Sequence, residues 1–243
     1  MRRVATLLLA TAALMGGCAD NQETLIVLFA PLWDEEGSCT IDSATDEALL
    51  HGTLDLSFRT PYIMPALLLN NSGDQRKNNT GVESNEIQVI DAEVTLDSPQ
   101  DPDLLNDLGD EFTHFTAALS TNSISPGETI GLGVEVIPQG TVNELAAAFG
   151  EMPPGAKVTV RANVVFNGTR TGNDVGKVGR VKARDFSFPI NLCNGCLLYC
   201  GGCTDTEGQP NGCPVNIGAL EGGVCGNAQD LPLWPSACEG PMN

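Results

Sequence analysis

Cysteines dominate the residues of this chain that could do chemistry, and their closest spacing is found near residue 200. Cys193, Cys196, Cys200 and Cys203 form two C-x2-C pairs separated by three residues. Such pairs serve as disulfides in an oxidising compartment, as thiolate ligands of a tetrahedral zinc ion, or as a redox couple. Zinc sites normally separate the two pairs by a longer segment, and a redox C-x2-C normally opens a helix in an α/β fold. The spacing therefore favours structural disulfides, with zinc and thiol redox chemistry as the alternatives.

Eight of the nine cysteines are expected to form four disulfides, because an even number of clustered cysteines indicates a disulfide framework where the compartment is oxidising. Seven of them lie in residues 193–243 and cannot all pair with one another, so one is expected to reach back to Cys39. The predicted disulfide cysteines are Cys39, Cys193, Cys196, Cys200, Cys203, Cys213, Cys225 and Cys238. The spacing does not define which of them are partners.

Two acidic segments carry the oxygen-bearing side chains that calcium prefers. One spans residues 97–111, and the other contains Asp205, Glu207 and Asn211 between two cysteines. Neither follows the order of an EF-hand loop, so solvated surface acid is the default interpretation. Calcium at Asp205, Glu207 and Asn211 is kept as an alternative, and no cofactor is predicted.

Residues for catalysis are scarce. The chain has two histidines, His51 and His114, and neither a G-x-S-x-G nor an H-E-x-x-H motif. A hydrolytic triad needs a base that an acid orients toward an exposed nucleophile, and no such set stands out. The sequence therefore predicts no catalytic residue, with a hydrolase of unrecognised type as the alternative.

Residues 24–192 are expected to form the β-structure that positions these groups. Period-two alternation predicts strands at 52–58, 87–96, 112–119, 130–136, 158–166 and 186–192. In the first of these strands, Asp55 is expected on the polar face, opposite Leu54 and Leu56.

Proline, asparagine and glycine mark the interruptions of this pattern. Residues 62–69 are expected to form an edge strand or a bulge because Pro65 lies inside the run. Residues 70–80 and 167–172 are expected to be exposed loops. Seven to eight strands with regular turns predict an immunoglobulin-like β-sandwich, with a closed barrel as the alternative.

One short helix and a change of composition complete the predicted architecture. Thr141 and Glu144 have the spacing of a capping box ahead of an alanine-rich run that stops at Gly150. From residue 193 onward glycine, proline and cysteine replace the apolar periodicity, so this segment needs covalent links to fold. The predicted units are a β-sandwich at 24–192 and a disulfide-rich, irregular appendage at 193–243.

Residues 1–17 have the pattern of a secretory signal peptide. Arg2 and Arg3 precede an apolar run from Val4 to Met15 that is too short to cross the roughly 30 Å hydrocarbon core as a helix. The small residues before Cys18 resemble the lipobox of bacterial lipoproteins. In that family the signal is removed and the lipidated cysteine becomes the new N-terminus. The resemblance implies a lipid on Cys18, a tether over residues 18–23 and, because alanine follows Cys18, an outer-membrane location.

A second resemblance covers most of the chain. Its motifs are Gly37-Ser38-Cys39, a Gly-Thr-Leu-Asp-Leu strand and Phe-Pro-Ile-Asn-Leu-Cys-Asn-Gly-Cys-Leu at the start of the cysteine-rich segment. In these motifs the chain is similar to uncharacterised cysteine-rich lipoproteins of myxobacteria. The resemblance implies a location and an architecture, and it implies no activity.

The charge of the chain restricts its partners. A formal net charge of −19 repels nucleic acid, and aromatic residues, at 5%, are too few for a stacking platform. The sequence predicts a lipid-anchored, non-enzymatic cell-envelope protein that acts as a structural or binding module. Its expected partners are the membrane, through Cys18, and another envelope protein or a surface polymer. Calcium or zinc binding and hydrolysis remain the alternative functions.

Overall fold

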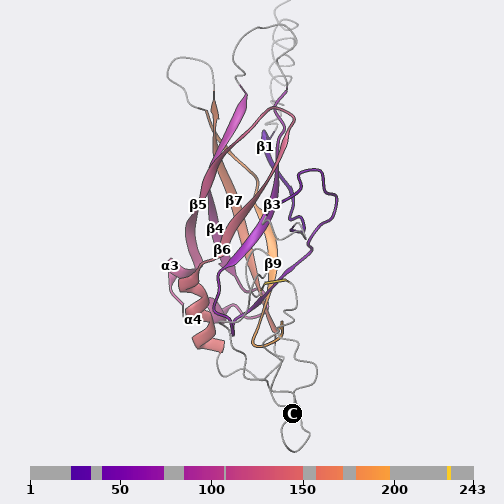
Figure 1. The fold of residues 1–243 in the computed structure, drawn as a ribbon. Helices are drawn as coiled ribbons and strands as arrows, with labels where there is room; N and C mark the ends of the chain where they lie inside the picture. Colours follow the sequence, from indigo (N-terminus) through magenta and orange to yellow (C-terminus); the bar gives the residue numbers. More distant parts are fainter. Residues whose placement is uncertain are drawn as a thin grey trace, which may run out of the picture.

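The computed structural model describes residues 23–33, 40–73, 85–106, 108–149, 157–171, 179–197 and 229–230. In these residues the chain is mainly β, and two sheets pack face to face as a β-sandwich (Figure 1). The expected mainly β, sandwich fold is therefore confirmed, whereas nearly all of the expected appendage at 193–243 lies outside the described residues. No helix among the described residues is long and apolar enough to cross a membrane.

The larger sheet has six strands in the order β2-β9-β7-β4-β5, with β8 paired to β7 beyond the end of β9. Its strands are β2 (Gly52–Asp55), β4 (Glu86–Asp97), β5 (His114–Ile124), β7 (Lys157–Thr171), β8 (Gly179–Lys182) and β9 (Phe186–Cys193). All of its pairs are antiparallel except β2 with β9. That parallel pair brings the carboxyl ends of the two strands to the same end of the sandwich.

The smaller sheet has three strands in the order β1-β3-β6: β1 (Leu25–Phe29), β3 (Tyr62–Asn70) and β6 (Thr129–Ile137). Residues from the segment between β1 and β2 lie on its outer face, where β6 has glycines. A Cβ atom at Gly131 would lie 2.5 Å from Ile41, and one at Gly133 would lie 3.0 Å from Trp33. Gly131 and Gly133 therefore leave space for Ile41 and Trp33 on the outer face of the sheet. Leu132, between them, is buried in the core.

The core lies between the two sheets and follows the alternation read from the sequence. Leu54, Ile87, Val94, Val134, Val160 and Phe188 are among its buried residues. At about 25 cal/mol for each Å² of apolar surface removed from water, this burial is the main favourable term that holds the sheets together.

Three helices occur in the described part of the chain, where the sequence predicted one. They are the single turns α2 (Asp103–Asn106) and α3 (Asp110–Thr113) and the predicted helix α4 (Gln139–Phe149). The expected capping role of Thr141 is not observed. Its hydroxyl is buried and donates to the carbonyl of Phe112 (3.0 Å), so it joins α4 to α3.

One of the expected interruptions of the strands is different in the structure, and the one at Pro65 is confirmed locally, since β3 has a register shift between Tyr62 and Ile63. Residues 167–171 are not a loop, because β7 continues to Thr171 between β4 and β8. β3 lies between β1 and β6, although Pro65 falls beyond the part that β1 covers. Ile63, two residues before Pro65, turns its N–H and C=O to that same uncovered edge. The missing N–H of Pro65 therefore interrupts no ladder bond.

Candidate functional site

The parallel pair of β2 and β9 creates a corner where Asp55 lies beside the C-x2-C motif. Asp55 and Cys193 are register partners at the carboxyl ends of the two strands. The expectation that Asp55 faces solvent is wrong, since its exposed fraction is 0%. A carboxylate buried in this way needs hydrogen-bond donors to offset its loss of water.

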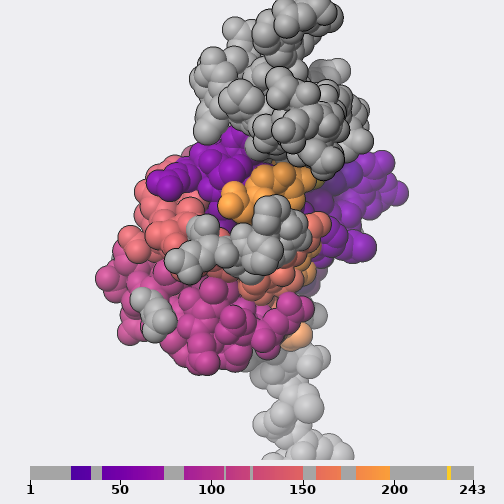
Figure 2. Space-filling model, turned by 90° about the horizontal axis from the view of Figure 1, so that it is seen from below, coloured from indigo at the N-terminus to yellow at the C-terminus, as the bar shows by residue number. Residues whose placement is uncertain are grey.

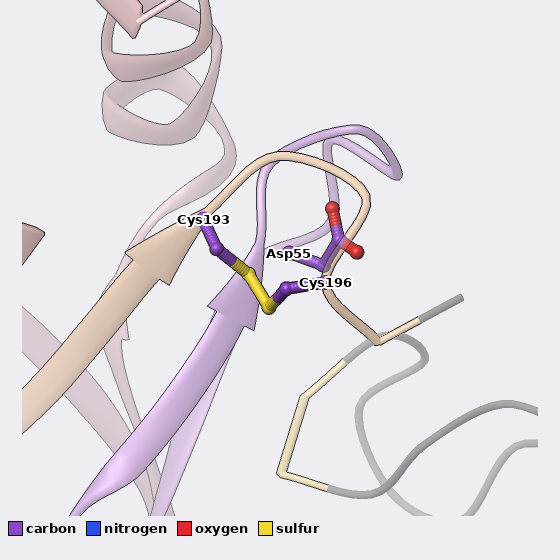
Figure 3. A group of neighbouring side chains, drawn as sticks. All are labelled: Asp55, Cys193 and Cys196. Carbon is purple, nitrogen blue, oxygen red and sulfur yellow. A yellow bond between two sulfur atoms is a disulfide. The ribbon is translucent and has the colours of Figure 1, made fainter. Parts of the chain in front are cut away.

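The Asp55 carboxylate lies beside the Cys193–Cys196 disulfide (Figure 3), and four donors surround it. Oδ1 accepts hydrogen bonds from the Ser57 N–H (3.0 Å), the Ser57 hydroxyl (2.7 Å) and the Gly195 N–H (2.8 Å). Oδ2 accepts one from the Leu197 N–H (3.0 Å). Gly195 has a φ of 73°, a conformation that glycine adopts without strain. Asp55 thus holds the turn that contains the C-x2-C motif.

Cys193 and Cys196 form a disulfide within this turn, with their Cα atoms 5.9 Å apart. The prediction that these two cysteines serve as a structural disulfide is confirmed. Asp55, Cys193 and Cys196 are also the one group of three potential metal ligands among the described residues. A disulfide has no thiolate to offer, and the carboxylate already accepts four bonds, so the geometry describes a linked turn rather than a zinc centre.

The disulfide corner, defined as Asp55 with Cys193–Leu197, lies at the end of the sandwich that carries the helices. Figure 2 looks onto this end, where the orange residues of β9 lie between purple residues near β2 and salmon residues of α4. The remaining predicted sites lie outside the described residues. These are Cys18, Cys39, Cys200, Cys203, Cys213, Cys225 and Cys238 and the calcium candidates Asp205, Glu207 and Asn211.

The acidic segment 97–111 places its first carboxylate in an ion pair. Asp97 accepts from Arg161 Nη2 (2.7 Å) and from the side-chain amide of Asn163 (2.8 Å). Both histidines contact neutral side chains on the six-stranded sheet. His114 Nδ1 lies 2.9 Å from the Thr95 hydroxyl, and His51 Nδ1 lies 3.4 Å from the Asn191 amide.

A second cluster of polar residues joins Gln229 and Asp230 to both sheets, and we call it the clasp. The side-chain amide of Gln229 pairs with the backbone of Ile63 in β3, with both hydrogen bonds at 2.8 Å. On the other sheet, the Asp230 N–H donates to the Thr53 carbonyl in β2 (2.9 Å). The Thr53 N–H in turn donates to Asp230 Oδ1 (2.7 Å). The clasp therefore links the edge strand β2 to the uncovered edge of β3.

Tyr62 completes the clasp from inside the sandwich. Its hydroxyl lies 2.9 Å from both carboxylate oxygens of Asp230, and its side chain is fully buried. Burial raises the pKa of Asp230 to about 6, although hydrogen bonds from Thr53 and Tyr62 and the nearby His51 each lower it. Burial, followed by the charge and the hydrogen bond of Asp230, raises the pKa of Tyr62 well above its usual value.

A groove of about 630 Å³ lies on the outer face of the six-stranded sheet, and we call it the polar groove after the charged and amide side chains in its lining. Its lining residues, from β4, β5, β7 and β8, include Asp91, Glu93, Thr116, Asn167 and Lys182. A β-bulge between Val89 and Asp91 bends β4 beside the groove. A bulge of this kind re-aims side chains and increases local twist, which helps to hollow the surface.

Cross-strand hydrogen bonds fix the polar side chains of the groove in place. The Asn167 amide donates to Asp91 (2.8 Å) and to Glu93 (3.2 Å), and Lys182 Nζ lies 2.9 Å from the other oxygen of Glu93. The hydrogen bond from Lys182, followed by that from Asn167, lowers the pKa of Glu93. The groove therefore offers carboxylate, amide and ammonium groups in fixed positions.

Sequence reasoning did not identify the groove or the clasp. Asp91, Glu93 and Asn167 are ordinary polar-face residues in a strand pattern, and only the strand register brings them together. Gln229 and Asp230 lie far along the chain from Thr53 and Tyr62 and form no motif with them. One local signal was available for Asp55, because a Cys-x-Gly-Cys turn after a strand needs acceptors for its backbone N–H groups.

Comparisons with known proteins identify no family for this chain. No family model matches it, and no curated protein matches it. Among solved structures, a protein from Archaeoglobus fulgidus is 13% identical with a TM-score of 0.28, and the match covers 53% of this chain and 85% of that one. A likeness this distant supports no argument about fold or function.

Proposed function

We propose that this chain is a lipid-anchored, non-enzymatic protein of the cell envelope that acts as a binding module at the outer membrane. The lipid is carried by Cys18, and the polar groove binds another component of the envelope. The groove is the observation that carries the binding role. A pocket with fixed polar groups on a rigid sheet is a typical binding site, because the sheet holds those groups in position before the ligand arrives.

The chemistry of the groove favours a polar ligand with hydrogen-bonding groups of both kinds. Asp91 and Glu93 offer acceptors, and Lys182 and Asn167 offer donors. The lining residues also include Arg180, so charges of both signs face the same space. Such a lining suits an uncharged or zwitterionic segment of a partner better than a strongly charged polymer.

The anchoring part of the proposal is tested by changing the lipobox. Cys18→Ser removes the thiol that would be lipidated, so the protein should leave the membrane fraction or stay unprocessed. Met15→Leu is the matched control, because it restores the residue usual at this lipobox position and should keep the protein in the membrane fraction. Unchanged fractionation of the Cys18→Ser variant would contradict lipid anchoring.

The binding part is tested by photo-crosslinking in cells. A photoreactive amino acid at Thr116 faces the groove, whereas one at Glu135 is exposed on the other sheet. We expect a discrete adduct from Thr116 and none from Glu135. The Thr116 adduct should weaken when Lys182→Ala removes the ammonium group. Equal adducts at both positions, or none at Thr116, would argue against the groove as the binding surface.

A further inference from the structure

The first described residues are fixed to one end of the sandwich. The Asn71 N–H donates to the Thr24 carbonyl (2.8 Å), and the Asn71 side chain donates to the Glu23 carbonyl (3.3 Å). Arg184, just after β8, forms an ion pair of 2.6 Å with the Glu23 side chain. The chain therefore leaves the sandwich toward Cys18 from a defined point beside Asn71.

Asn70 joins the residues at this end of the sandwich. We call them the tether end, and they are Glu23, Thr24, Asn70, Asn71, Asn85, Ile124, Gly127 and Glu128. The buried side-chain amide of Asn70 donates to the carbonyls of Asn85 and Ile124, both at 2.8 Å. Its backbone pairs with the turn that precedes β6, through Gly127 (2.8 Å) and Glu128 (3.1 Å). The ends of β3, β4 and β5 and this turn thus share one set of hydrogen bonds.

The distance from Cys18 to the tether end is short compared with the length of the sandwich. Glu23 lies five positions after Cys18, and an extended chain covers at most about 3.6 Å per residue, or ~18 Å. β7 has 15 residues, which at about 3.3 Å per residue is ~50 Å. The disulfide corner and α4 lie at the other end of the long axis (Figure 1).

From this geometry we infer that the sandwich stands on the phospholipid surface on its tether end, with the disulfide corner and α4 farthest from the membrane. The inference rests on the proposed lipidation of Cys18, because the short tether is what holds Glu23 at the surface. The partner of the tether end is the headgroup layer of the membrane that holds the lipid. The polar groove lies between the two ends and remains open to the side.

The test uses the full-length lipidated protein in vesicles of phosphatidylethanolamine and phosphatidylglycerol. A fluorophore is attached through an unnatural amino acid at Glu128, in the turn of the tether end, or at Glu144 on α4. Both glutamates are exposed, so they form a matched pair. A lipid with a nitroxide on its headgroup then quenches only fluorophores near the membrane surface.

We expect strong quenching at Glu128 and an unchanged signal at Glu144. Equal quenching at the two positions, or stronger quenching at Glu144, overturns the orientation while vesicle flotation still shows anchoring. A full chain that does not float with the vesicles, or a Cys18→Ser variant that floats as well as the wild type, overturns the lipid anchor and the orientation with it.

Discussion

The buried carboxylate of Asp230 predicts that the clasp loosens as the pH rises. Its pKa is raised from 3.8 to about 6, and a shift of one unit corresponds to about 1.36 kcal/mol. For this largely buried carboxylate the difference is worth ~3 kcal/mol. Asp230 binds its proton more tightly when the clasp is formed than when it is open. The stabilisation of the clasp is therefore fully present below pH ~3.8 and is lost as the pH rises through about 6.

The perturbation is Asp230→Asn, which cannot titrate but keeps an oxygen to accept from the Thr53 N–H. The assay is amide hydrogen exchange at Thr53 and Ile63, because their N–H groups donate to the side chains of Asp230 and Gln229. After correction for intrinsic exchange, the wild-type protection factors should fall by about 100-fold between about pH 4 and pH 8. The variant should show a much smaller fall.

Two further variants make the test specific. Tyr62→Phe removes a hydrogen bond that lowers the pKa of Asp230, so the midpoint of the wild-type change should move above pH 6. Asp185→Asn changes an exposed carboxylate and should leave the profile as it is. Protection that stays constant with pH in the wild type, or the same pH dependence in the Asp230→Asn variant, would refute the reasoning.

Three other changes test the packing described above by urea unfolding with the disulfides intact. Gly52→Ala would place a Cβ atom 2.1 Å from the Tyr62 hydroxyl oxygen, so it should lower the free energy of unfolding by about 1–3 kcal/mol. An unchanged free energy of unfolding would show that the close contact is absent. Asp55→Ala removes the acceptor for the Gly195 and Leu197 N–H groups and should lower the free energy of unfolding by about 3 kcal/mol. The control Asp42→Ala, at an exposed turn, should lower it by under about 1 kcal/mol. Equal losses would argue against a structural role for Asp55. Asn70→Ala leaves the buried carbonyl of Ile124 without its side-chain donor, so about 2 kcal/mol is expected, and a neutral effect would contradict the role of Asn70 at the tether end.

Much of the fold could be predicted because alternation along a strand depends on local sequence. Leu54, Val94, Val134 and Val160 are buried as their period-two patterns predict. Short-range signals were less reliable at the ends of elements. Residues 167–171 contain the turn-like Asn-Gly pair, yet they extend β7, because β4 and β8 pair with them on both sides.

The sites were harder to predict because they join residues that are distant in the sequence. Asp55 follows the alternation that places polar residues in solvent, but the parallel partner β9 places a turn with two N–H donors over it. The single feature of that corner available from the sequence was the C-x2-C motif, and its disulfide is confirmed. That the other cysteines also form disulfides remains a prediction.

The sequence alone determined most of the segments that form strands, which faces of those strands enter the core, and that Cys193 and Cys196 are disulfide cysteines. Those properties depend on residue type and spacing within a few residues. Tertiary structure decided the burial of Asp55, the clasp at Tyr62 and Asp230, and the groove beside Glu93. Each depends on which strands become neighbours and in what register, and strand pairing at long sequence separation leaves no local pattern.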